Sequence, residues 1–130
     1  MRLLLGTDAY SALKRGHTLA AELVRRSDEV LLSTVAAGVL LHGIRCGSRF
    51  VRTRQELDEF IASPSVKVIH VTMATADRFS RVAATRRRRG TPMPANDIRV
   101  AAQAMESEAE LLTRDRHCEA VDGLAWRRLE

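Results

Sequence analysis

Two aspartates in the last third of the sequence, Asp97 and Asp115, are the residues best placed to do chemistry. Asp97 lies in a segment whose apolar residues recur at i, i+3, i+4 and i+7 from Ile98, which predicts a helix with Asn96 as its N-cap. Asp115 follows residues 109–113, a short apolar run typical of a buried strand. An acid at a helix start and an acid at the carboxyl end of a parallel strand can meet at one sheet edge. The spacing therefore predicts a shared cation site.

Other polar residues are expected near the same edge. Asp8 follows a first apolar run and would add a third carboxylate if the chain stays extended after it. Ser33 and Thr113 stand at expected strand ends, where a hydroxyl can either serve a site or cap the next element. His117 can contact a substrate or have a structural role in its loop, and Asn96 can support Asp97.

Apolar runs and helical patterns alternate along the chain, and this alternation defines the expected fold. Strands are expected at residues 1–5, 29–33, 66–73 and 109–113, with an edge strand at 119–125 and a tail at 126–130. Helices are expected at residues 9–15, 18–26, 34–44, 53–62, 75–89 and 96 to about 106, with a capping box at Thr53 to Glu56 and a cap at Thr75. The pattern predicts one α/β domain over residues 1–130, with a parallel sheet covered by helices on both faces.

The segment 34–44 is apolar nearly all round, which is unusual for a helix on a protein surface. We expect it to lie in the core. The alternative is a homodimer seam, where Gly38 and Gly43 would allow close approach.

Arginine dominates the charge of this chain, whose formal net charge is +5 and whose only lysines are Lys14 and Lys67. Guanidinium groups match phosphate geometry, so an acidic or nucleic-acid partner is plausible, and a solvated basic surface is the alternative. The run 86–89 can bind phosphates or simply face the negative end of its helix. We favour the second interpretation.

Composition also bears on the compartment. Cys46 and Cys118 share no metal-site spacing, so we expect unpaired thiols in a reducing compartment rather than a disulfide or a metal site. The first apolar run is too short for a signal peptide, and no apolar run reaches membrane-spanning length. We therefore expect a cytoplasmic protein.

Several short stretches, in this order and spacing, resemble PIN-domain proteins, most closely the VapC-type toxins of bacterial toxin–antitoxin pairs. These stretches are Leu-Leu-Gly-Thr-Asp at 4–8, Leu-Ser-Thr-Val-Ala-Ala-Gly-Val-Leu at 32–40, Gly-Ile-Arg-Cys-Gly-Ser-Arg at 43–49, Pro-Met-Pro-Ala-Asn-Asp-Ile at 92–98 and Leu-Thr-Arg-Asp-Arg-His at 112–117. The resemblance covers nearly the whole chain.

The resemblance implies a three-layer α/β/α fold around a mostly parallel sheet of about four or five strands. It also implies a metal-dependent endoribonuclease whose acidic residues hold Mg²⁺ or Mn²⁺. Asp97 and Asp115 occupy two of the family's acidic positions. Gly6 and Val39 stand where the family has an aspartate and a glutamate, and Asp8 stands at the family's usual asparagine.

These departures leave two functions open. One is an RNA-hydrolysing toxin, attenuated by the loss of two acids, in which Asp97, Asp115 and, as a substitute, Asp8 hold the metal. The alternative is a silenced PIN domain that binds RNA or an antitoxin, whether the acids were lost naturally or by an introduced change. The resemblance further implies a cognate antitoxin as partner, and a homodimer.

Overall fold

Five short strands form the centre of the protein, in the computed structural model that describes residues 1–129. They are β1 (Arg2–Leu5), β2 (Glu29–Ser33), β3 (Val66–Ile69), β4 (Glu110–Thr113) and β5 (Trp126–Arg128). Their order in the sheet is β3-β2-β1-β4-β5, and every pair of neighbouring strands is parallel. The expected parallel α/β architecture is confirmed.

The central strand β1 is buried on both faces, as its unbroken leucine run predicts. Leu3 and Leu5 point to one face of the sheet and Leu4 to the other, because successive side chains alternate along a strand. Leu4 is in register with Leu31 of β2 and Leu111 of β4, and these three residues belong to the same core cluster. The sheet therefore needs helices on both faces.

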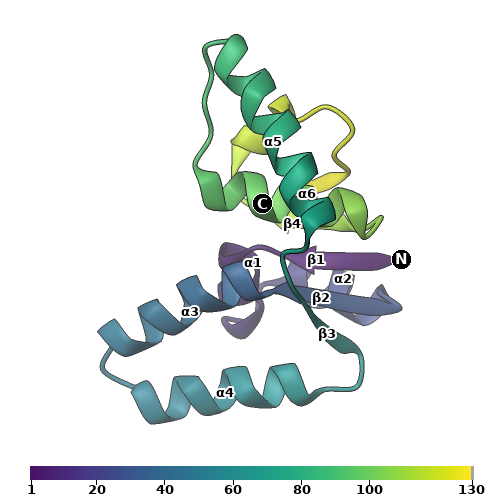
Figure 1. Cartoon of the computed structure of the whole chain (residues 1–130). Helices are drawn as coiled ribbons and strands as arrows, with labels where there is room; N and C mark the ends of the chain where they lie inside the picture. The colour runs from purple at the N-terminus through teal and green to yellow at the C-terminus, as the bar shows by residue number, and fades with distance from the viewer. Residues whose placement is uncertain (130) are drawn as a thin grey trace.

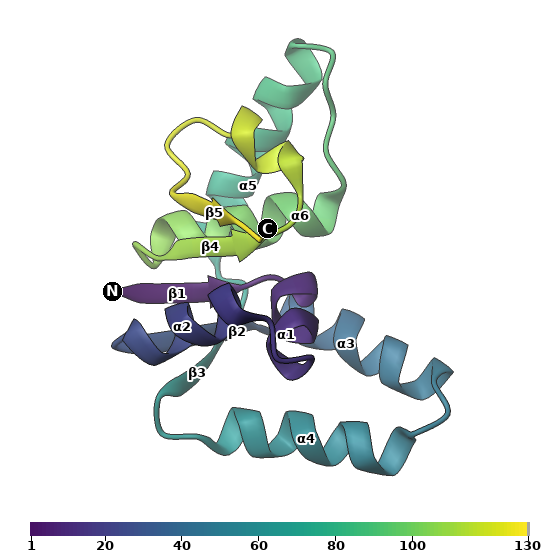
Figure 2. The ribbon, with the colours of Figure 1, turned by 180° about the vertical axis from the view of Figure 1, so that it is seen from behind.

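Helices supply those two outer layers (Figure 1). Helices α1 (Thr7–Lys14) and α2 (Thr18–Arg26) cover the face of Leu3 and Leu5, whereas α6 (Ala95–Glu106) covers the face of Leu4. Helix α5 (Met73–Arg88) packs on α6. Helices α3 (Thr34–Cys46) and α4 (Phe50–Ala62) form a pair that projects from the sheet, as the rear view in Figure 2 also shows. The three-layer α/β/α fold is confirmed.

The order in which the chain adds strands to the sheet reverses between β1 and β4. The chain runs outward from β1 to β2 and β3, then crosses the other face through α5 and α6 and returns beside β1 as β4. In parallel α/β sheets, ligands bind outside the carboxyl ends of the strands at such a switch point. The carboxyl ends of β1 and β4 are therefore the place to look for a site.

Helix α1 begins at Thr7 rather than at residue 9, so Asp8 lies in its first turn. Three expected helix caps are also wrong. Helix α4 begins at Phe50, so Thr53 lies inside it and its hydroxyl donates to the Arg49 carbonyl. Helix α5 begins at Met73, and its N-cap is Thr72, which forms a reciprocal capping box with Thr75. Helix α6 begins at Ala95, after Pro94, so Asn96 is not its cap. In each case a cap-like residue lies just inside the helix, where its hydroxyl or amide finds another local partner.

Strand and tail boundaries differ as well. Strand β3 ends at Ile69, four residues before the expected Met73. The segment expected as an edge strand contains instead the end of a 3₁₀ turn, η1 (Arg116–Ala120), and the expected tail contains β5. Glu130 lies outside the described residues. Strand β5 pairs with β4, which a pattern of three residues could not reveal.

Helix α3 is only partly buried. Ala36 is its only buried residue, and Val39 is 44% exposed. One side packs on α1 and α4 through partly buried apolar residues (Ala37, Leu40, Leu41 and Ile44). The core interpretation of residues 34–44 therefore holds for this side of the helix only, because the α3–α4 pair projects beyond the sheet edge (Figure 1).

Arg86 departs from both interpretations of the arginine run. Its side chain is buried, with a relative exposure of 6%. The guanidinium donates to the carbonyl of Thr91 at 3.2 Å and to that of Ala120 at 2.7 Å, and also to the Thr91 hydroxyl. Arg86 therefore joins α5, the loop before α6, and η1, whereas Arg87, Arg88 and Arg89 are exposed.

Both cysteines are free thiols, so the disulfide alternative is wrong. Cys46 is exposed at the end of α3, and Cys118 is buried in η1. No helix among residues 1–129 combines the length and apolar character needed to cross a membrane.

Candidate metal centre

A cavity of about 370 Å³ opens at the carboxyl ends of β1 and β4. Seven of the residues singled out in the sequence line it: Gly6, Asp8, Val39, Asn96, Asp97, Thr113 and Asp115. They come from the β1–α1 junction, from α3, from the start of α6 and from the end of β4. The cavity therefore stands at the switch point of the sheet.

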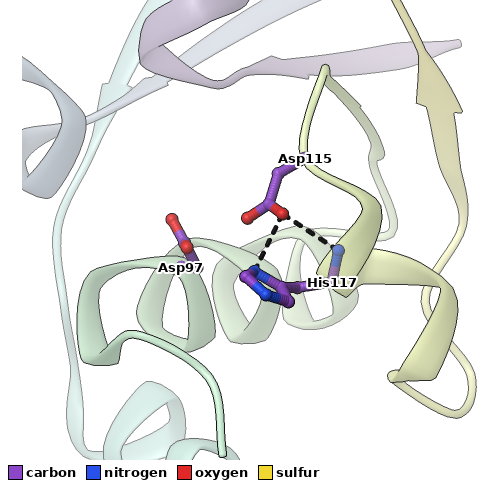
Figure 3. A group of neighbouring side chains, drawn as sticks. All are labelled: Asp97, Asp115 and His117. Carbon is purple, nitrogen blue, oxygen red and sulfur yellow. Dashed lines mark hydrogen bonds and ion pairs between the residues drawn. The ribbon is translucent and has the colours of Figure 1, made fainter.

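Asp97 and Asp115 meet in this cavity, and His117 lies beside them without lining it. Each of the three residues offers one ligand atom, and these atoms all lie within 4.8 Å of one another. Figure 3 shows one Asp115 oxygen bound to His117 while the other is turned toward Asp97. Two acids that are 18 positions apart in the sequence thus converge, because one begins α6 and the other follows β4.

Asp115 is held in place by its own loop. Its backbone N–H donates to the Thr113 hydroxyl at 3.1 Å. Its Oδ1 accepts a hydrogen bond from the His117 backbone N–H at 2.9 Å and lies 2.9 Å from the imidazole Nδ1. Asp115 is therefore the N-cap of η1, and one of its oxygens is committed to that turn.

The local electrostatics shift the pKa values of the two acids in opposite directions. Burial raises the pKa of Asp97 to about 6, and the hydrogen bond to Asp115 and the charges of Asp115 and Asp8 add to the rise, while His117 opposes it. Burial also acts to raise the pKa of Asp115, but hydrogen bonds from the His117 backbone and from Asp97 outweigh it and hold that pKa below its usual value. Asp97 therefore carries the proton that the pair retains in weak acid. Paired acids with pKa values pushed apart are typical of functional sites.

Asp8 lies near this pair but stands outside the group that can share an ion. Its carboxylate accepts hydrogen bonds from the backbone N–H groups of Ala9 and Arg114, at 2.8 and 2.7 Å, and from the Thr113 hydroxyl at 3.2 Å. These bonds use both of its oxygens. They connect the start of α1 to the end of β4.

Two other expected site residues, Ser33 and Asn96, form hydrogen bonds with other parts of the fold. Ser33 is fully buried, its hydroxyl donates to Gln103 and accepts from the Val35 backbone N–H, and it does not line the cavity. Asn96 lines the cavity, and its side-chain oxygen accepts a hydrogen bond from Arg99 at 3.0 Å. The structure thus brings Asn96 to the site but not Ser33.

Cys118 is a cavity residue that the sequence did not single out for the site. Burial raises the pKa of its thiol to about 12, and the charges of Asp115, Asp97 and Asp8 add to this rise. The side chain is therefore a neutral thiol, which packs against the site as a small apolar group. Its position directly before the expected strand 119–125 carried no signal that could place it there.

Comparison with known families identifies this arrangement. The profile of the PIN domain matches residues 7–124, which is most of the chain. The chain belongs to the PIN-domain family. The cavity with Asp97 and Asp115 is therefore the candidate centre of a PIN domain.

Solved structures with the same fold include toxin–antitoxin proteins. The chain of this PIN domain superposes on one from the DNA-bound VapBC2 of Rickettsia felis with a TM-score of 0.87 and 17% identity, over 100% of both chains. A chain of the DNA-bound VapBC of Salmonella typhimurium gives 0.88 and 18%, over 100% of this chain and 99% of that one. VapC20 of Mycobacterium tuberculosis, a toxin that cleaves the sarcin–ricin loop, gives 0.64 and 16%, over 84% and 86%.

At these identities the superpositions establish the fold of the PIN domain. A search of curated protein sequences gave no significant match.

Proposed function

We propose that this PIN domain is a divalent-metal-dependent endoribonuclease of the VapC toxin type, attenuated by the absence of acids at Gly6 and Val39. One observation carries the proposal: the carboxylates of Asp97 and Asp115 converge in a cavity at the switch point of the sheet. The convergence supports a cation site because two carboxylates placed together repel each other unless they share a proton or a cation, and above pH 6 Asp97 no longer keeps its proton.

The donor set fits Mg²⁺ or Mn²⁺. These ions prefer carboxylate oxygens and are often held by only one or two carboxylates together with water and phosphate. Asp97 and Asp115 would be the ligands, and the contacts of His117 with Asp115 Oδ1 would orient the Asp115 carboxylate. A bound divalent ion supplies a more acidic water and polarises a phosphoryl oxygen.

The residues of the site divide the remaining work. Asp115, with its lowered pKa, stays ionised and keeps one oxygen turned into the cavity. Asp97 gives up its proton near pH 6 and is then a second anionic ligand. Val39 and Cys118 add apolar surface to the cavity lining.

The exposed position of Val39 provides a test of attenuation. Because Val39 lines the cavity and is 44% exposed, Val39→Glu can add a carboxylate without disturbing the core. We expect RNA cleavage at limiting Mn²⁺ to rise about tenfold, the equivalent of ~1.4 kcal/mol of added metal binding. The assay is cleavage of total bacterial RNA followed on a denaturing gel.

Two controls accompany this assay. Val51→Glu places the same charge on α4 at a site that is 77% exposed and outside the cavity, and it should leave cleavage unchanged. Asp97→Asn should remove cleavage from both the parent and the Val39→Glu variant. Cleavage that survives Asp97→Asn, or that rises equally with Val51→Glu, contradicts the proposal.

Metal affinity should depend on pH through Asp97. Since the folded protein holds a proton on Asp97 up to about pH 6, metal and proton compete for the same oxygens below that pH. We expect Mn²⁺ affinity to be nearly constant above pH 7 and to fall about tenfold for each pH unit below 6. Calorimetric titrations at pH 5, 6, 7 and 8 measure this, and equal affinities at pH 5 and 7 would exclude Asp97 as a ligand.

We further propose a cognate antitoxin as partner, since the similar structures include a toxin–antitoxin complex from Klebsiella pneumoniae and VapBC-5 of Mycobacterium tuberculosis, a member of a family of toxin–antitoxin systems. A largely apolar groove of about 630 Å³ between α1, α3 and α4 is the surface that fits a protein segment.

We also propose a homodimer that uses the exposed side of α3. Light scattering should then give twice the 14.5 kDa chain mass, and a monomer at micromolar concentration contradicts the dimer.

A further inference from the structure

The Asp8 carboxylate is anchored at three points. Oδ1 accepts the Ala9 backbone N–H at 2.8 Å. Oδ2 accepts the Arg114 backbone N–H at 2.7 Å and the Thr113 hydroxyl at 3.2 Å. A carboxylate that accepts several N–H and O–H donors is held in one orientation. Asp8 therefore fixes the end of β4 to the start of α1, across more than a hundred positions of sequence.

A second hydrogen bond extends this anchor to the candidate metal centre. The Thr113 hydroxyl donates its one proton to Asp8 and accepts the backbone N–H of Asp115 at 3.1 Å. A hydroxyl can do both at once, because it has one donor and two lone pairs. Asp8, Thr113 and Asp115 thus form a relay that sets where the Asp115 backbone leaves β4.

The same carboxylate occupies the space beside Gly6. A Cβ atom at residue 6 would lie 2.9 Å from Asp8 Oδ1 and 3.2 Å from the carbonyl oxygen of Leu112. The backbone at Gly6, with φ of −71° and ψ of 169°, is open to any residue, so the obstacle is space rather than conformation. A side chain at residue 6 would force the Asp8 carboxylate off its hydrogen-bond donors.

We propose that Asp8 is a positioning residue for Asp115, acting through Thr113, and not a metal ligand, and that its anchored carboxylate excludes a side chain at residue 6. The first half of this inference rests on the proposed metal site. The second half concerns packing alone.

The metal half is tested by Mn²⁺ titration of the metal-free protein, followed by electron paramagnetic resonance. Asp8→Asn keeps an oxygen that can accept from Thr113 and Arg114, so we expect about threefold weaker binding, whereas Asp8→Ala should lose about thirtyfold. Thr113→Val removes the relay but no carboxylate, and it should weaken binding about as much as Asp8→Ala. If Asp8→Asn is as weak as Asp8→Ala while Thr113→Val binds normally, Asp8 is a ligand and the inference is wrong.

The packing half is tested without metal, by a double-mutant cycle in urea. Gly6→Ala should raise the unfolding equilibrium constant about tenfold in the parent, as overpacking does, but less than about threefold in the Asp8→Ala background. Folding of Gly6→Ala only in the presence of Asp8→Ala supports the same conclusion. An equal cost in both backgrounds, or failure to fold in both, assigns the obstacle to the Leu112 carbonyl and overturns this half.

The two halves fail separately. A parent protein that binds no Mn²⁺ at millimolar concentration removes the proposed function and the positioning role together. The cycle between residues 6 and 8 is still decided by its own stability measurements.

Discussion

Replacing Asp97 by asparagine is expected to remove metal binding and, in the absence of metal, to stabilise the fold. The first effect follows from the loss of one of two carboxylate ligands, and we expect Mn²⁺ affinity to fall by at least ~100-fold, or ~2.7 kcal/mol. The second follows from electrostatics. At pH 7.5 the ionised Asp97 lies beside Asp115 in a partly buried place that favours its protonated form.

The sign of the stability effect comes from linkage. Because the pKa of Asp97 rises from 3.8 to about 6 on folding, the folded state binds more protons than the unfolded state between these pH values. The protein therefore loses stability as pH rises through this window. The shift is equivalent to ~3 kcal/mol, and allowance for solvent screening at this partly exposed group leaves about 1 kcal/mol. Asp97→Asn should return this energy and raise Tm by about 3 °C.

Asp115→Asn is the matched comparison, because it removes the other acid of the pair. The pKa of Asp115 is lowered on folding, so its charge stabilises the fold above its unfolded pKa, and that contribution is lost as pH falls through the folded value. Asp115→Asn should therefore lose metal binding as Asp97→Asn does, but it should lower Tm. Calorimetric titration and thermal unfolding at pH 7.5 measure both properties. A Tm change in the same direction for the two variants would contradict the opposite pKa shifts assigned to Asp97 and Asp115.

Replacing Arg86 by alanine is expected to cost the fold about 3 kcal/mol, which makes it one of the most destabilising changes outside the leucine core. The guanidinium is buried and donates to the carbonyls of Thr91 and Ala120. Its removal leaves both acceptors without that donor and leaves a void between α5 and η1. Urea unfolding followed by circular dichroism measures the loss.

The neighbouring arginine provides the control for this prediction. Arg87→Ala makes the same chemical change one residue later, at an exposed position, and should alter stability by no more than about 0.5 kcal/mol. Arg86→Lys should recover little of the lost stability, because one ammonium group cannot reproduce the planar guanidinium, which donates to the carbonyls of both Thr91 and Ala120. Equal losses for Arg86→Ala and Arg87→Ala would mean that the buried contacts contribute nothing.

Local patterns account for the parts of the fold that were predicted well. Strand β2 and helix α2 have the expected boundaries, because a continuous apolar run and a one-sided helical period are short-range signals. Helix starts were predicted less well, since Thr53, Thr75 and Asn96 are all competent caps and each stands inside its helix. A residue's capping propensity does not say which of several neighbouring residues will be used.

Helix α3 and Arg86 were misjudged for a different reason, which is that burial depends on neighbours. The apolar character of residues 34–44 is real, but only one side of α3 packs on the core, because α3 and α4 extend past the sheet. Arg86 carries a charge that normally indicates exposure, yet it is buried and donates to the carbonyl of Thr91, after the end of α5, and to that of Ala120 in η1, 34 positions away. Neither arrangement has a signature within a window of one helix.

The sequence by itself determined the alternation of strands and helices, and with it the placing of Asp97 at a helix start and Asp115 just past a strand. These are local properties, because hydrophobic period and strand length are read over a few residues. Only the tertiary structure decided that the two acids share one cavity and that the Asp8 carboxylate accepts hydrogen bonds from the end of β4. Asp8 and its donors Thr113 and Arg114 lie more than a hundred positions apart, and the parallel register of β1 and β4 is what brings them within hydrogen-bonding distance.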